Sequence, residues 1–116
     1  MEKLFDAELK LMEIIWECEP VSAKEISAAA ARAFGWNKNT TYTVIKRLIE
    51  KKALRRDEPG FICTSLIKID QVQKAETKTL IEKLFGGSKK AFFAAFADEK
   101  LSSEEVEALR ALIDNH

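Results

Sequence analysis

The side chains best suited to binding chemistry gather in one window, residues 36–56, where seven basic residues occur with a single acid, Glu50. The window carries a formal charge of +6, whereas the residues on each side of it sum to −3. Its basic side chains are Lys38, Lys46, Arg47, Lys51, Lys52, Arg55 and Arg56. Such a cationic segment predicts contacts with nucleic-acid phosphates. The alternative interpretation is a charged face that is merely solvated.

Apolar residues within this window recur at helical spacing and predict a helix over residues 38–52, with Asn37 as its N-cap. The opposite face of that helix is polar. Its candidates for reading base edges, because they offer donors, acceptors or a methyl group, are Asn39, Thr40, Thr43 and Lys46. The residues expected to contact the DNA backbone, which fixes register without reading sequence, are Lys38, Arg47, Lys51, Lys52, Arg55 and Arg56.

Two helices are expected before this window. Residues 7–18 carry an amphipathic pattern that follows Asp6, a good N-cap. Ser22 and Glu25 have the spacing of a capping box, which predicts a second helix over residues 23–34. The polar helix of the window would then be the third helix, the one that enters the major groove in a helix-turn-helix.

A β-hairpin is expected after the third helix. Residues 54–57 and 61–65 are candidate strands, and Pro59 and Gly60 between them have the chemistry of a turn. Three helices followed by a hairpin is the order of a winged helix. We therefore expect a mainly α fold, with a winged helix-turn-helix DNA-binding domain and its small β-hairpin wing over residues 1–69.

Residues 70–116 have helical patterns again and form the second expected domain. Gly86 and Gly87 interrupt the first of these helices, and Ser102 with Glu105 predicts the start of the last one. So short a segment buries its apolar residues best against a partner, so we expect a helical dimerisation domain. The residues expected to mediate dimerisation are Leu80, Leu84, Phe85, Phe92, Phe93, Phe96, Leu109, Leu112 and Ile113.

The sequence offers little for catalysis, and we expect no enzyme. The one histidine, His116, is the final residue, so neither a Ser-His-Asp triad nor a Cys-His pair has a positioned base. Two distant cysteines, Cys18 and Cys63, give neither a zinc site nor a disulfide framework, and no cofactor or metal is expected. No apolar run is long enough for a membrane span, and we expect a cytoplasmic protein without membrane insertion.

Several motifs together resemble the penicillinase repressor family, the BlaI/MecI/CopY repressors. They are Asp6-Ala7-Glu8, Met12-Glu13-Ile14-Ile15-Trp16, Val21-Ser22-Ala23-Lys24-Glu25-Ile26, Trp36-Asn37-Lys38-Asn39-Thr40-Thr41-Tyr42-Thr43 and Leu84-Phe85-Gly86-Gly87-Ser88. The resemblance implies a winged-helix domain, a helical dimerisation domain and binding to inverted-repeat operators upstream of resistance or stress genes. It places Thr40, Thr43 and Arg47 on recognition-helix positions.

The same resemblance bears on how repression ends. In the β-lactam-responsive branch, a membrane sensor triggers proteolysis at an Asn-Phe bond, and a membrane sensor-protease system is therefore a possible partner. The matching position here is Ala95-Phe96, without the asparagine. The copper-responsive branch carries a C-terminal cysteine cluster, which this chain lacks.

We therefore expect a homodimeric, sequence-specific transcriptional repressor whose partners are double-stranded operator DNA and a second copy of itself. The alternative is a winged-helix scaffold that contacts proteins and does not read DNA. The two hypotheses differ in the basic window, because a scaffold gains nothing from clustering a charge of +6 on one helix and its hairpin.

Overall fold

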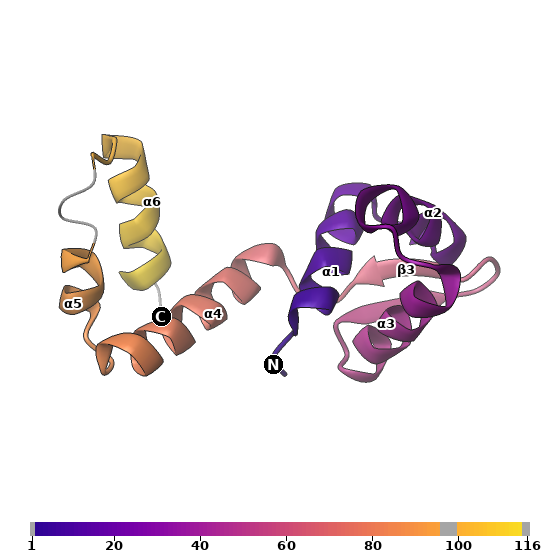
Figure 1. Cartoon of the computed structure of the whole chain (residues 1–116), viewed down its shortest axis with the longest axis horizontal. Coiled ribbons are helices and arrows are strands. Elements are labelled where there is room, and N and C mark those ends of the chain that lie inside the picture. The colour runs from indigo at the N-terminus through magenta and orange to yellow at the C-terminus, as the bar shows by residue number, and fades with distance from the viewer. Residues whose placement is uncertain (1, 96–99, 115–116) are drawn as a thin grey trace. The chain divides into compact units, whose positions relative to one another are not determined.

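The computed structural model describes the backbone of residues 2–95 and 100–114, and side chains as far as residue 111. The chain divides into two compact units, Met1–Lys68 and Ile69–His116 (Figure 1). The first unit contains α1 (Asp6–Cys18), β1 (Val21–Ser22), α2 (Ala23–Phe34), α3 (Lys38–Glu50), β2 (Leu54–Asp57) and β3 (Ile62–Ser65). The second unit contains α4 (Ile69–Phe85), α5 (Lys89–Ala94) and α6 (Ser103–Asp114).

Local capping defines the helix starts of the first unit. The Glu25 amide donates to Ser22 Oγ at 3.1 Å, which confirms the expected cap of α2. The expectation that Asp6 caps α1 was wrong, because the helix already includes Asp6 and its N-cap is Phe5. The Glu8 carboxylate accepts from the Phe5 amide at 2.7 Å and so satisfies the helix start from inside the first turn.

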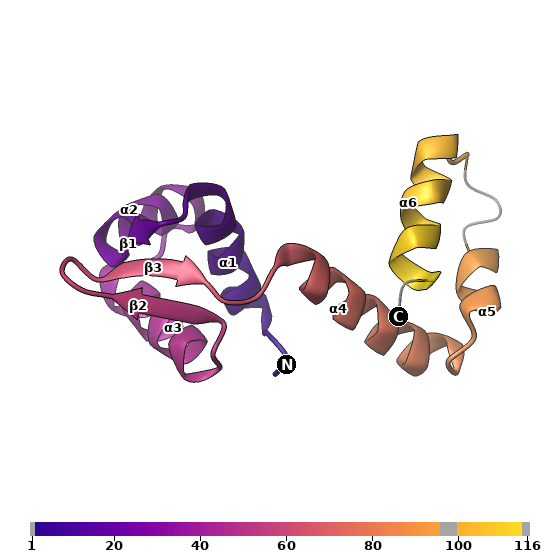
Figure 2. The ribbon, with the colours of Figure 1, turned by 180° about the vertical axis from the view of Figure 1, so that it is seen from behind.

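The strands form one antiparallel sheet in the order β1-β3-β2. Figure 2 shows the three strands side by side, with the loop between β2 and β3 projecting at one edge of the unit. This hairpin is the expected wing, although β3 begins at Ile62 because Phe61 has a positive φ of 51°. The pattern did not predict β1, a two-residue strand in which Val21 pairs with Cys63.

The core of the first unit joins its three helices to the sheet. The largest fully buried side chains are Leu11, Met12, Ile15, Ile26, Ile45, Leu48, Leu54, Glu8, Thr41 and Cys63. Each helix contributes its apolar face, and burial of those faces is the main force that holds α3 in place. Thr41 satisfies its buried hydroxyl by donating to the Asn37 carbonyl at 3.3 Å.

The second unit has its own small apolar cluster. Ile81 on α4 and Phe92 on α5 are buried together, and Phe85, Phe93 and Leu109 pack against them. Ser88 and Ser102 accept from the amides three residues later, at 3.0 and 3.1 Å, and these caps begin α5 and α6. Among the helices that the structure describes, none combines the length and apolar character that crossing a bilayer requires.

The residues expected to mediate dimerisation fall into different environments. Phe85, Phe92, Phe93 and Leu109 belong to the cluster of their own unit. Leu80 and Leu84 are exposed by 40% and 72% and are one helical turn apart on α4. The remaining three lie outside the residues whose side chains are described, namely Phe96, Leu112 and Ile113.

Candidate nucleic-acid interface

The polar face of α3 is open to solvent over the whole first half of the helix. The four candidate base-reading residues, Asn39, Thr40, Thr43 and Lys46, are all exposed. Asn37 Oδ1 accepts from the Thr40 amide at 2.8 Å, so the helix start is capped without using any of the four reading side chains. This face can therefore present donors, acceptors and methyl groups to a major groove without unfolding.

The hydroxyl proton of Thr43 is already used in a hydrogen bond within α3. Its hydroxyl donates to the Asn39 carbonyl one turn earlier, at 2.9 Å. What remains available on Thr43 is the methyl group, which suits the thymine methyl, together with the two lone pairs of the oxygen. Thr43 is thus better suited to apolar contact and acceptance than to donation.

The wing carries guanidinium groups that are exposed and held in position. The Arg56 guanidinium lies over the Phe61 ring, 3.6 Å from its centroid, and its Nε donates to Glu58 at 2.6 Å. Arg55 Nε donates to Asp57 at 2.9 Å. Exposed pairs of this kind contribute little stability, so exchanging a carboxylate for a DNA phosphate costs little.

Glu58 is the carboxylate that organises the hairpin loop. Its other oxygen accepts from the Phe61 amide at 3.1 Å. This hydrogen bond, together with the Arg56 guanidinium, lowers the pKa of Glu58. Glu58 is therefore ionised at neutral pH and holds the Arg56 guanidinium in an ion pair.

A groove of about 430 Å³ separates α3 from the wing, and both sides of it carry basic residues. Its lining consists of Tyr42, Lys46, Ile49, Glu50, Arg56 and Phe61. The Tyr42 and Phe61 rings meet edge to face, with centroids 5.9 Å apart. The sequence pattern placed Phe61 in a candidate strand and gave neither Tyr42 nor Phe61 a part in the interface. Only the hairpin register, which brings residue 61 back beside Arg56 and α3, could have indicated that Phe61 lines this groove.

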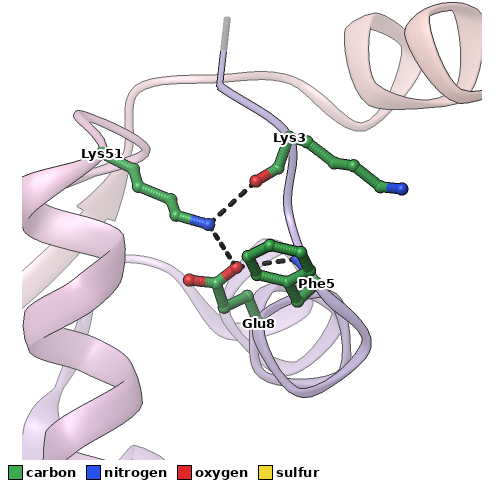
Figure 3. A network of polar contacts seen from close by, with 4 residues as sticks. All are labelled: Lys3, Phe5, Glu8 and Lys51. Atoms are coloured by element: carbon green, nitrogen blue, oxygen red, sulfur yellow. Dashed lines mark hydrogen bonds and ion pairs between the residues drawn. The ribbon is translucent and has the colours of Figure 1, made fainter.

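Lys51 has a different environment from the other basic residues of the window. Figure 3 shows its ammonium directed toward the Glu8 carboxylate and the Lys3 carbonyl. Lys51 Nζ lies 2.6 Å from Glu8 Oε1 and 2.8 Å from the Lys3 carbonyl oxygen. By contrast Lys38, Arg47 and Lys52 are exposed. We therefore leave Lys51 out of the interface proposed below, although the sequence had placed it there.

Cysteine and other metal-binding side chains do not cluster in the part of the chain that the structure describes. No three histidine, cysteine, aspartate or glutamate side chains come together there in a way that could hold a metal ion. Cys63 is buried, and burial raises the pKa of its thiol. Cys18 is exposed.

Comparisons with known proteins show which family the chain belongs to. The family model described as "Penicillinase repressor" matches residues 4–115. This chain belongs to the penicillinase repressor family. A penicillinase repressor from Staphylococcus aureus is 34% identical over 112 residues, which are 94% of this chain and 89% of the relative. The methicillin resistance regulatory protein MecI of Mammaliicoccus sciuri is 28% identical over 115 residues, or 97% and 94% of the two chains.

Two solved structures resemble the first unit of this repressor. The solution structure of the DNA-binding domain of the repressor BlaI has a TM-score of 0.55 and 31% sequence identity. The match covers 60% of this chain and 90% of the chain in that structure. The Bacillus licheniformis BlaI monomeric form was solved in complex with the blaP half-operator. It has a TM-score of 0.54 and 30% sequence identity, and the match covers 60% of this chain and 87% of that structure's chain. The expected winged-helix fold is confirmed. The family and the relatives are described by their names as repressors or regulatory proteins of resistance.

Proposed function

We propose that this repressor acts as a homodimer in which each winged-helix unit binds one half of an inverted-repeat operator. The observation that carries the proposal is the exposed polar face of α3 beside the wing. The guanidinium groups of the wing are paired with exposed carboxylates, which DNA phosphates could replace. The likeness to BlaI, whose monomeric form was solved with a half-operator, supports the same use of this unit.

Within this proposal the side chains divide by role. Those that read base edges from the first half of α3 are Asn39, Thr40, Thr43 and Lys46. Those that hold phosphates are Lys38, Arg47, Lys52, Arg55 and Arg56. Five phosphate contacts per half-site correspond to a slope of about −4.5 in the plot of log affinity against log salt, at about −0.9 for each phosphate.

The proposed dimer forms through the second unit. Leu80 and Leu84 are two exposed leucines on one face of α4, and a second copy could cover both. A symmetric pair places its two recognition helices in successive major grooves, which matches an operator with two-fold symmetry. A chain truncated after Ile69 should then sediment as a monomer and bind its operator much more weakly, because one unit must bind alone.

Relief of repression by proteolysis is the remaining part of the proposal. Ala95 is exposed and is the C-cap that follows α5, whereas Phe96 lies outside the described residues. Cleavage there by a membrane sensor-protease system would cut the covalent connection between α5 and α6, leave α6 held only by its packing on the cluster, and so weaken the dimer. Two relatives are named as a penicillinase repressor and a methicillin resistance regulatory protein. We therefore propose resistance genes as the targets and the cytoplasm as the place of action.

The experiment that tests the function begins by selecting the fragments of the source genome that the purified chain retains. We expect the retained fragments to share an inverted repeat in a promoter region, and footprinting to protect both halves of it. Fragments without a common sequence, bound no better than random DNA, would refute sequence-specific repression.

A further inference from the structure

A buried ion pair lies at the end of the recognition helix that is remote from the reading residues. Glu8 on α1 is only 2% exposed, and the side chain of Lys51, the C-cap of α3, is 16% exposed. Glu8 Oε1 accepts both from Lys51 Nζ at 2.6 Å and from the Phe5 amide at 2.7 Å. Figure 3 shows that these contacts tie together α1, the segment before it and the end of α3.

The ammonium of Lys51 has three neighbouring groups within the first unit. Besides Glu8 it donates to the Lys3 carbonyl at 2.8 Å, and it lies 4.4 Å from the centroid of the Phe5 ring. Of the three protons of the ammonium, two are donated to these oxygens, and the ring face adds a cation–π contact. A DNA phosphate could recruit Lys51 only by breaking this arrangement and leaving Glu8 buried without its cation.

Stability alone is a poor explanation for this pair. Taking two charges out of water costs about as much as their attraction returns, and apolar side chains of similar volume often serve equally well. The pair also leaves Glu8 Oε2 buried with no hydrogen-bond partner, which adds a further cost. What directed hydrogen bonds supply, and apolar contact does not, is a single defined position for the atoms that they join.

The position that the pair defines matters because α3 is rigid. The helix has 13 residues and is therefore about 20 Å long, at about 1.5 Å per residue. Asn37 is the N-cap of the helix and Lys51 is its C-cap. After Lys51 the chain turns at Lys52, which has a positive φ, and enters the wing strand β2. Fixing Lys51 therefore fixes both the tilt of the reading face and the root of the wing. Binding surfaces need their groups held to within about 0.5 Å.

We infer that Glu8 and Lys51 are positioning residues: their ion pair, held by the Lys3 carbonyl and the Phe5 amide, sets the angle of α3 and the wing toward operator DNA. Lys51 does not contact DNA. The inference rests on the proposed function, since it assigns these two residues a part in operator discrimination.

The test compares Lys51→Met with Lys52→Met, which removes an exposed neighbouring cation, in the full-length repressor. Binding to a selected operator and to a scrambled duplex is measured by fluorescence anisotropy at several salt concentrations. For Lys51→Met we expect an unchanged salt slope and a loss of operator preference on the order of tenfold, the cost of roughly one base contact. For Lys52→Met we expect the preference to persist while the slope becomes shallower by about 0.9 per half-site.

A third variant keeps the test valid if Lys51→Met unfolds. The double variant Glu8→Gln with Lys51→Met leaves no unpaired buried charge, so we expect it to fold cooperatively in a thermal scan and still lose operator preference. Full operator preference in the folded double variant would overturn the inference and make the pair merely structural. A shallower salt slope for Lys51→Met would overturn it by identifying a phosphate ligand. A parent protein that prefers no sequence would refute the proposed function itself.

Discussion

Replacing Lys46 by methionine tests the base-reading face at its most informative position. Lys46 is exposed on α3 and lines the groove toward the wing with Ile49 and Phe61. Methionine keeps an unbranched apolar stem against that groove and removes only the ammonium. Because the side chain is exposed, we expect the free energy of unfolding to change by less than about 0.5 kcal/mol.

The expected loss in binding follows from the value of one base contact. A good side-chain contact to a base edge contributes about 1 to 3 kcal/mol, and about 1.4 kcal/mol corresponds to a tenfold change. Lys46→Met should therefore weaken operator binding by about 5- to 150-fold per half-site. Binding to scrambled duplex should fall much less, because non-specific affinity depends on phosphates.

The measurement is an anisotropy titration with operator and scrambled duplexes at several salt concentrations. Lys90→Met is the matched control, since Lys90 is an exposed lysine on α5 in the other unit. The control should leave the ratio of the two affinities unchanged. Equal losses on both duplexes for Lys46→Met, with a shallower salt slope, would refute base reading and assign Lys46 to the phosphate backbone.

Three further predictions concern assembly and stability. The pair Leu80→Glu and Leu84→Glu should give a folded monomer in sedimentation equilibrium, because both leucines are exposed within their own unit; a persisting dimer would exclude this face. Lys52→Gly should raise the free energy of unfolding in urea by about 1 kcal/mol, since Lys52 has a left-handed φ of 62°; no gain would contradict that backbone conformation. Ser22→Ala should lower the same quantity by about 1 kcal/mol through loss of the α2 cap, and an unchanged midpoint would show that the cap is not formed in solution.

Features set by neighbouring residues were predictable from the sequence. The capping box of Ser22 and the cap from Asn37 depend on contacts three residues apart, and both occur as expected. The polar face of α3 follows from helical periodicity, which places Thr43 outward and Leu48 inward. The strand β1 was missed because two residues carry no periodicity of their own.

Features that join distant parts of the chain were not predictable. Lys51 and Glu8 are 43 positions apart, and nothing in either local pattern indicates that they meet. The second unit presents the same difficulty, because periodicity shows that a helix is apolar without showing which apolar residue faces inward. Phe92 is buried in its own unit and Leu84 is exposed, although both fit the apolar pattern equally well.

Amide chemical-shift mapping of the full chain with its selected operator tests the central claim most directly. We expect the largest changes at the first half of α3, around Thr40 and Thr43, and at the wing around Arg56, with small changes on the buried side of the helix. Changes concentrated on the second unit, with α3 unaffected at saturating operator, would contradict the assignment of this surface to DNA.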